Sequence, residues 1–221
     1  MSKNAITPPD ALLLTAPGCP HCPTVLRGLD DLVNQGLIGK LEVVDIALHP
    51  ERAAALNVRA VPWVKLGPFE LEGLRSPAEL RSWAQRANSM TGTARYFEEL
   101  LKEGKLEKVS QFVKDQPNAI EALLILASDK EAELTVRIGV SAIIEAYEGS
   151  EILNNHFEGL QALSENEDPR VRSDACHFLS LTHNPKAIST LKNLTQDPER
   201  SVRDIAVESL DDIQEEINKY H

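Results

Sequence analysis

Residues 11–33 read ALLLTAPGCPHCPTVLRGLDDLV and decide the class of the N-terminal part of the chain. The first four residues form an uninterrupted apolar run followed by Thr15, and Ala11–Thr15 is typical of a buried β-strand. From Pro20 to Gln35 the apolar side chains recur with helical spacing, and Gly36 ends the helix. Cys19 and Cys22 therefore fall between a buried strand and the first turn of a helix.

Outside this stretch the hydrophobic period changes repeatedly as far as about residue 88, which is typical of an α/β unit. Ser76-Pro77-Ala78-Glu79 marks the start of the last helix with a serine cap, a proline and a glutamate. The remaining elements are expected over Leu41–Ile46, Pro50–Leu56, Trp63–Leu66, Phe69–Leu71 and Ser76–Asn88. The order β-α-β-α-β-β-α predicts an α/β domain over residues 1–88, with a right-handed crossover and a closing hairpin.

After Ser89 the strand pattern stops and helical segments follow one another. They are expected over Thr93–Glu103, Leu106–Lys114, Ala119–Ser128, Glu131–Glu148, Ile152–Ser164, Pro169–Leu181, Pro185–Thr195 and Glu199–Asn218. Asp168-Pro169-Arg170-Val171-Arg172 recurs as Asp197-Pro198 followed by Val202-Arg203, and the two valines stand 31 positions apart. Since this length accommodates one helical hairpin per repeat, the sequence predicts an all-α repeat domain over residues 92–221.

The helical part resembles HEAT-like repeats of the short kind seen in phycocyanobilin-lyase-type proteins. The resemblance rests on the Asp-Pro and Val-Arg pairs and on the small residues Ala175 and Ala206, and it is clearest over residues 165–210. HEAT repeats are mostly protein-binding scaffolds, so the resemblance implies an interaction surface for a protein client or redox partner. We expect Arg172 and Arg203 to bond to neighbouring helix ends or acidic residues.

Charge is divided unevenly between the two parts. Met1–Met90 holds nine Lys and Arg against nine Asp and Glu, whereas Thr91–His221 holds fourteen against twenty-five, a net charge of −11. Because an acidic surface repels phosphate groups, we expect no nucleic-acid partner and no docking on membrane lipid. No apolar run approaches the ~18 residues that span a bilayer, and the first residues lack a secretory core, so a cytoplasmic location is expected.

The cysteines of Cys19-Pro20-His21-Cys22 stand three positions apart at a helix start, where they can close a small disulfide. Unpaired amides and the helix dipole stabilise a thiolate there, and the thiolate is the form that attacks disulfides. Cys19 is the predicted nucleophile, and Cys22, one turn into the helix, is predicted to resolve the mixed disulfide. A zinc site would need more ligands than this pair, so we expect neither a metal nor another cofactor.

The segment up to residue 88 resembles the thioredoxin fold family. Besides the cysteine motif, the resemblance rests on Val61-Pro62 before the third strand and on the turn at Gly73-Leu74. It implies a cis bond at Pro62 and an open backbone edge beside the redox pair, where Pro20, Val61, Pro62 and Trp63 border the substrate. Trp63 could equally fill the core as a strand aromatic.

Three features distinguish this chain within that resemblance: the Pro-His dipeptide, Leu13 and Gly18. The Pro-His dipeptide is the one found in strongly oxidising relatives, which implies that His21 stabilises the Cys19 thiolate. Thioredoxins carry a buried acid and an aromatic residue where this chain has Leu13 and Gly18. The proton relay that the acid supports is therefore absent at the matching position.

Two functions fit these residues. The first is a thiol–disulfide oxidoreductase that exchanges disulfides of proteins or small molecules through Cys19 and Cys22, with the helical repeats holding a protein partner. The alternative is a holdase chaperone or assembly adaptor whose redox activity is secondary; a thioredoxin fold without catalysis is a further alternative. Cys176, beside Ala175 and Phe178 in a helical repeat, is expected to be a buried structural cysteine.

Overall fold

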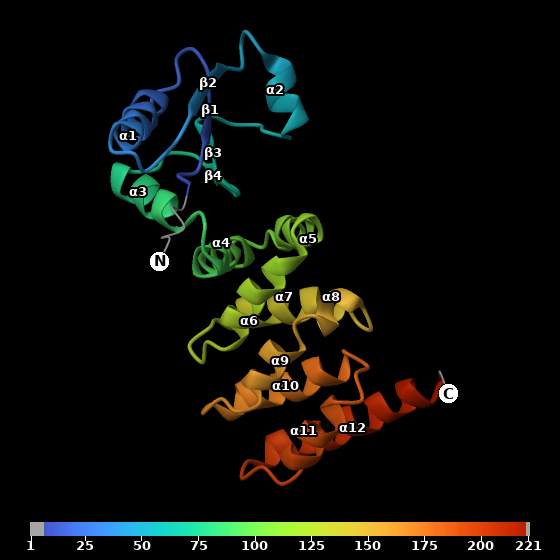
Figure 1. Ribbon diagram of the computed structural model, residues 1–221. Helices are drawn as coiled ribbons and strands as arrows, with labels where there is room; N and C mark the ends of the chain where they lie inside the picture. The colour runs from blue at the N-terminus through green and yellow to red at the C-terminus, as the bar shows by residue number, and fades with distance from the viewer. Residues whose placement is uncertain (1–6, 220–221) are drawn as a thin grey trace. The chain divides into compact units, whose positions relative to one another are not determined.

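The computed structural model describes residues 7–219, and the chain divides into two compact units, Met1–Gly92 and Thr93–His221. The first unit is built on a β-sheet with helices beside it, and the second is helical throughout its described residues (Figure 1). The division falls within one helix, α4, which spans Met90–Lys102.

The sheet of the first unit is mixed, with four strands in the order β2-β1-β3-β4. The strands span Ala11–Thr15 (β1), Leu41–Asp45 (β2), Trp63–Leu66 (β3) and Phe69–Glu72 (β4). β1 pairs in parallel with β2 and antiparallel with β3, and β3 and β4 form an antiparallel hairpin. The order of elements is therefore the one that the sequence predicts.

Helices cover both faces of this sheet, with α1 and α3 on one side and α2 on the other (Figure 1). They span Cys22–Asn34 (α1), Pro50–Ala55 (α2) and Pro77–Arg86 (α3). Leu14 of β1 pairs with Val44 and with Trp63, so the three side chains project to the same face. There they form a core cluster with Ala53 of α2.

The opposite face of the sheet carries the side chains that alternate with this cluster, and α1 and α3 cover it. Leu13 and Val64 are paired across β1 and β3, and both are fully buried. Trp83 of α3 packs edge to face against Phe69 of β4, with ring centroids 5.1 Å apart. Aromatic burial of this kind holds α3 on the sheet.

The helix starts follow local side-chain chemistry. The predicted capping box of α3 is present: the Glu79 amide donates to Ser76 Oγ (3.3 Å), and the Ser76 amide donates to the Glu79 carboxylate (2.8 Å). The first helix begins at Cys22 and not at Pro20. The Cys19 amide closes a turn onto the Ala16 carbonyl at 3.2 Å, and His21 provides the first carbonyl that accepts helical amides, so residues up to His21 lie outside the helix.

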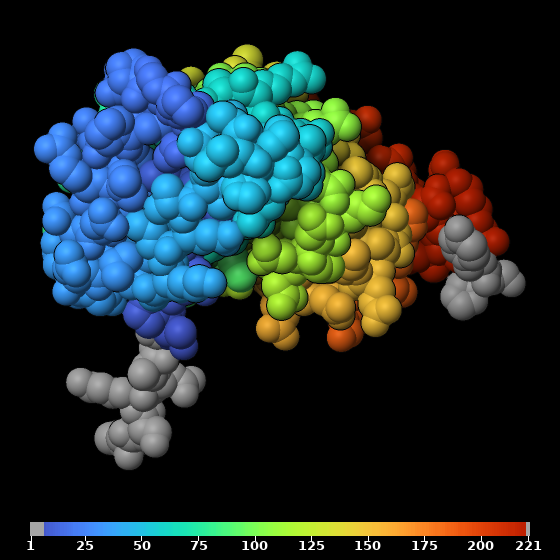
Figure 2. Space-filling view, turned by 90° about the horizontal axis from the view of Figure 1, so that it is seen from above, coloured from blue at the N-terminus to red at the C-terminus, as the bar shows by residue number. Residues whose placement is uncertain are grey.

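The second unit contains short helices joined by tight turns. After α4 these are α5 (Leu106–Asp115), a 3₁₀ turn (Pro117–Ala119), α6 (Ile120–Ala127), α7 (Leu134–Glu145), α8 (Glu151–Asn154), α9 (Phe157–Leu163), α10 (Pro169–Ser180), α11 (Ala187–Leu194) and α12 (Arg200–Lys219). Their succession from green to red is visible in the ribbon and in the space-filling view (Figures 1 and 2). Successive helices thus stack along the unit in chain order, as expected for repeats.

One predicted helix, Ile152–Ser164, is wrong, because the structure divides it into α8 and α9. The break lies at His156, whose ring Nδ1 lies 2.9 Å from the carbonyl oxygen of Ile152. That oxygen would accept the His156 amide in a continuous helix, but the amide donates to Leu153 instead, at 3.0 Å. A side chain therefore competes with the backbone and interrupts the helix.

Candidate functional site

One edge of the sheet gathers four connecting segments of the first unit. β1 and β2 end there, β3 starts there, and β4 returns to it, because β3 is antiparallel to both of its neighbours. The segments at this edge are residues 16–21, 46–49, 56–62 and 73–76. The first and third belong to the two central strands, so the cysteine motif and Pro62 lie next to each other at the middle of the edge.

Cys19 and Cys22 are joined by a disulfide, with their Cα atoms 5.6 Å apart. Cys19 lies before α1 and is partly exposed, whereas Cys22 is the first residue of α1 and only 5% exposed. The Cys22 amide donates to Cys19 Sγ at 3.2 Å. An amide at a helix start that already points at this sulfur can stabilise negative charge on it, so Cys19 is the better placed nucleophile.

The turn before the two cysteines explains why Gly18 stands at the position where thioredoxins carry an aromatic residue. Gly18 has φ +76°, a left-handed conformation that favours glycine over any residue with a side chain. No atom lies within 4 Å of where a Cβ would stand, so the backbone conformation and not crowding selects glycine here. The missing aromatic residue is thus linked to the path of the chain into Cys19.

Pro20 and His21 lie between the two cysteines and are exposed. His21 occupies the N-cap position of α1, but its side chain makes no capping hydrogen bond. The helix start is instead held by backbone bonds, in which the Thr24 and Val25 amides donate to the His21 carbonyl at 3.1 and 3.2 Å. The His21 side chain is therefore exposed and takes no part in capping α1.

The Val61–Pro62 peptide bond is cis, which is the isomer expected from the resemblance. The Pro62 carbonyl accepts a hydrogen bond from the Gly73 amide at 2.9 Å, which ties the start of β3 to the end of β4. Trp63 is 2% exposed and belongs to the core cluster, and Val61 packs against the same cluster. The core alternative for Trp63 is therefore the observed one, and we assign its side chain no contact with substrate.

Cys176 is fully buried in α10, as expected for a structural cysteine. Burial raises the pKa of its thiol to about 12, so it stays protonated near neutral pH. A buried thiol in this state is a poor nucleophile, which leaves the Cys19–Cys22 pair as the candidate redox centre. Within residues 7–219, no group of three or more His, Cys, Asp or Glu side chains is arranged to hold a metal ion.

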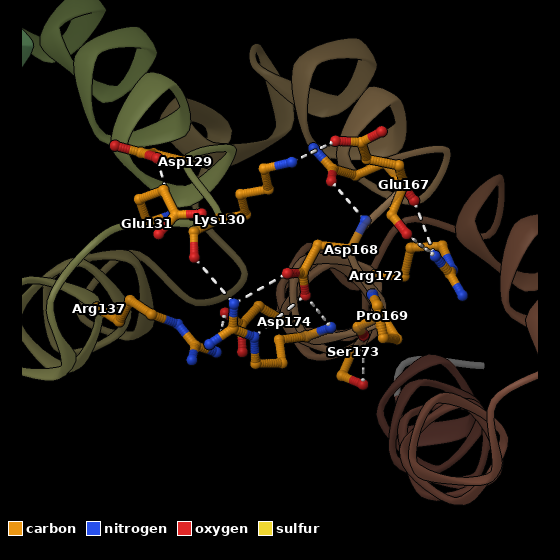
Figure 3. Close-up of polar contacts among 12 residues, drawn as sticks. Asp129, Lys130, Glu131, Arg137, Glu167, Asp168, Pro169, Arg172, Ser173 and Asp174 are labelled. Atoms are coloured by element: carbon orange, nitrogen blue, oxygen red, sulfur yellow. Dashed lines mark hydrogen bonds and ion pairs between the residues drawn. The ribbon is translucent and has the colours of Figure 1, made fainter.

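Ionic contacts join successive repeats in the helical unit. Arg172 of α10 donates from Nε and Nη2 to the carboxylate of Asp197 at 2.8 and 2.9 Å. Arg137 of α7 donates to Asp174 at 2.8 Å, and a further pair joins Lys130 and Glu167, as Figure 3 shows. The expectation that Arg172 bonds to acidic residues and helix ends is confirmed.

Arg203 repeats part of this pattern, because it donates to the carbonyl oxygens of Asp197 and Pro198 at 2.7 and 2.8 Å. Asp168 caps α10 by accepting the Arg170 amide at 2.8 Å, and the Arg170 side chain is the main cause that lowers the pKa of Asp168 to about 2. The Asp-Pro and Val-Arg signatures are thus structural: they cap helices and fix one repeat on the next.

An exposed apolar surface on α7 was not found from the sequence. Leu134 and Ile138 lie one helical turn apart and are 69% and 60% exposed. Aligning the repeats on their buried valines places Ser173 and Asp204 at the position of Ile138. That polar-to-apolar difference between repeats is the signal that could have revealed the surface.

Residues 156–217 match the family model of HEAT repeats. No curated protein matches the chain. HEAT repeats commonly mediate protein interactions, and the matched region covers α9 to α12 with the ionic contacts of Arg172 and Arg203. Among the residues that the structure describes, none of the helices is long and apolar enough to cross a membrane. The match does not include the N-terminal unit. For that unit, a relationship to known proteins is indicated only by its own sequence motifs and fold.

Proposed function

We propose that the N-terminal unit is a thioredoxin-like thiol–disulfide oxidoreductase domain and that the HEAT repeats bind its protein partner. The observation that carries the proposal is the Cys19–Cys22 disulfide at the first turn of α1, with the Cys22 amide directed at Cys19 Sγ. The order of strands and helices and the position of Pro62 at the same edge support it. The chemistry requires nothing beyond these two thiols and those of the substrate.

The oxidised form reacts with a client dithiol in two exchanges. A client thiolate attacks Cys19 Sγ, the Cys19–Cys22 bond breaks, and Cys22 leaves as a thiolate that takes up a proton. The second client thiol loses its proton and attacks the client sulfur of the mixed disulfide, which releases Cys19 as a thiolate. Two electrons pass from the client to the protein, so the client becomes a disulfide and the Cys19–Cys22 pair becomes a dithiol.

The same steps in reverse reduce a client disulfide. Cys19 then attacks the client, and Cys22 displaces the client sulfur from Cys19. The burial of Cys22 suits this resolving role, because the mixed disulfide forms at the more accessible cysteine. His21, exposed and without a capping bond, is proposed to stabilise the Cys19 thiolate. The exposed Pro20 is proposed to border the client chain together with the backbone at Pro62, whose ring is buried.

The proposal is tested with the full chain equilibrated in buffers of varied reduced to oxidised glutathione. Alkylation followed by mass spectrometry reads the fraction of Cys19–Cys22 that is oxidised. We expect a two-electron transition that disappears in Cys19→Ser and is unchanged in the control Cys176→Ala. A pair whose redox state does not respond to the glutathione ratio contradicts the proposal.

The second candidate function is a holdase chaperone or assembly adaptor. The exposed Leu134 and Ile138 on α7 favour it, because exposed apolar side chains close together are typical of protein-binding surfaces. Protection of a heat-denatured client from aggregation separates the two functions. A chaperone keeps its protection when Cys19 and Cys22 are both replaced by serine and loses it in Leu134→Ser/Ile138→Ser, whereas the redox function shows the opposite dependence.

A further inference from the structure

The edge of the sheet that carries the disulfide has an uneven charge. Its four connecting segments, residues 16–21, 46–49, 56–62 and 73–76, contain no Asp or Glu. Their basic side chains are His21, His49, Arg59 and Arg75. Of these, the two arginines carry positive charge at neutral pH, within segments through which a substrate approaches Cys19.

The carboxylates that border these segments already have partners. Asp45, at the end of β2, accepts the Ala47 amide at 2.8 Å. A Glu51 carboxylate oxygen lies 3.4 Å from ring Nδ1 of His49. Glu79 accepts hydrogen bonds from Ser76, which lower the pKa of its carboxyl, and it lies 3.7 Å from Arg75. Glu72, at the end of β4, is not free either. Two of the basic side chains thus have acidic partners.

Arg59 is different, because it is exposed and has no hydrogen-bond or ion-pair partner among the residues that the structure describes. It stands three positions before Pro62, a stretch of at most ~10 Å when extended. Pro62 precedes Trp63, which pairs with Leu14, and so lies beside the end of β1. The chain then passes from β1 through Ala16, whose carbonyl accepts the Cys19 amide at 3.2 Å.

We propose that Arg59 binds a carboxylate of the substrate, so that this chain prefers disulfides flanked by acidic residues. This inference rests on the proposed oxidoreductase function and assigns its substrate class. A guanidinium presents parallel N–H donors that match a carboxylate, and here none of them is occupied. The contact forms before exchange and leaves with the product, so it selects the substrate without entering the thiol chemistry.

Three peptides that contain one disulfide and differ only in the residues flanking each cysteine, Glu, Gln or Lys, test this. The measurement is the second-order rate constant for their reduction by the reduced full chain. We expect the order Glu, Gln, Lys from fastest to slowest, with a difference that shrinks at high salt. Arg59→Ala should slow the Glu peptide about three- to tenfold and leave the Gln peptide unchanged.

Arg81→Ala is the matched control, because Arg81 is also exposed and unpaired in the described part of the chain but lies on α3. A reversal, Arg59→Glu, should make the Lys peptide faster than the Glu peptide. An unchanged order in both Arg59 variants, or an equal loss in Arg81→Ala, overturns the inference while the exchange itself stands. If the wild type neither reduces the peptide disulfides nor oxidises the same peptides in their dithiol form, the oxidoreductase proposal fails and the inference with it.

Discussion

Replacing Arg172 tests how the HEAT repeats are held together. Its side chain is 12% exposed, that of Asp197 is 5% exposed, and two hydrogen bonds of 2.8 and 2.9 Å join them. In Arg172→Ala the buried carboxylate of Asp197 loses both of these hydrogen bonds and keeps only the one donated by the Glu199 amide, at 2.9 Å. Breaking a buried pair costs roughly 3–5 kcal/mol, and the remaining amide favours the lower end, so we expect a loss of about 3 kcal/mol.

The two units can be followed separately in this experiment. Both tryptophans, Trp63 and Trp83, belong to the first unit, so their fluorescence reports on it alone, whereas far-UV circular dichroism is dominated by the helices of the second. In urea, Arg172→Ala should lower the free energy of unfolding from the circular-dichroism transition and leave the fluorescence transition in place. Arg170→Ala, at a more exposed pair, should have a smaller effect.

The same pair predicts a dependence on pH. Arg172 is the main cause that lowers the pKa of Asp197 from its ordinary value, so the folded state binds this proton less tightly than the unfolded state. The stabilisation is therefore present above about pH 4 and is lost as the pH falls through the folded-state pKa. Stability of Arg172→Ala should depend less on pH in that range. A loss below about 1 kcal/mol, or one equal to that of Arg170→Ala, refutes the reasoning.

Three further predictions concern the first unit. In the reduced protein, Cys19 should be alkylated before Cys22, and Cys176 only on unfolding, because burial raises its pKa; equal rates by mass spectrometry would contradict this. His21→Ala should make the pair less oxidising in the glutathione equilibrium, and an unchanged potential would exclude that role. A fragment of residues 1–92 should fold and exchange disulfides with small thiols, with circular dichroism and alkylation as the measurements; an unfolded fragment would show that the two units are one cooperative structure.

Local chemistry explains which parts of the fold are predictable from the sequence. The capping box at Ser76 and Glu79 depends on residues three positions apart, so its pattern is visible before any tertiary contact forms. The break at His156 is not visible in the same way, because the hydrophobic period continues through it while the imidazole competes for a backbone carbonyl. Periodicity records which face is buried, and it does not record side-chain hydrogen bonds to the backbone.

The residues of the candidate site also differ in how far they can be predicted from the sequence. Cys19 and Cys22 stand only three positions apart, so their spacing alone predicts a disulfide at a helix start. Arg59 is 40 positions from Cys19, and only the pairing of β1 with β3 brings their segments to one edge. Sequence spacing therefore identifies the cysteines proposed to react, whereas the residue proposed to select the substrate emerges only from strand order and register.

The alternation of side chains at the start of β3 explains how one segment serves both the core and the site. Trp63 projects to the face of α2 and anchors the strand in the core cluster, together with Val61 two positions earlier. Pro62 lies between them in sequence and two positions before Val64, whose side chain belongs to the face covered by α1. Since Trp63 pairs with Leu14 near the end of β1, the buried tryptophan holds the start of β3, and with it the buried Pro62, at the edge where the segment with Cys19 leaves β1. Trp63 thus contributes to the site by positioning Pro62. Its own burial is therefore compatible with an exposed edge beside the disulfide.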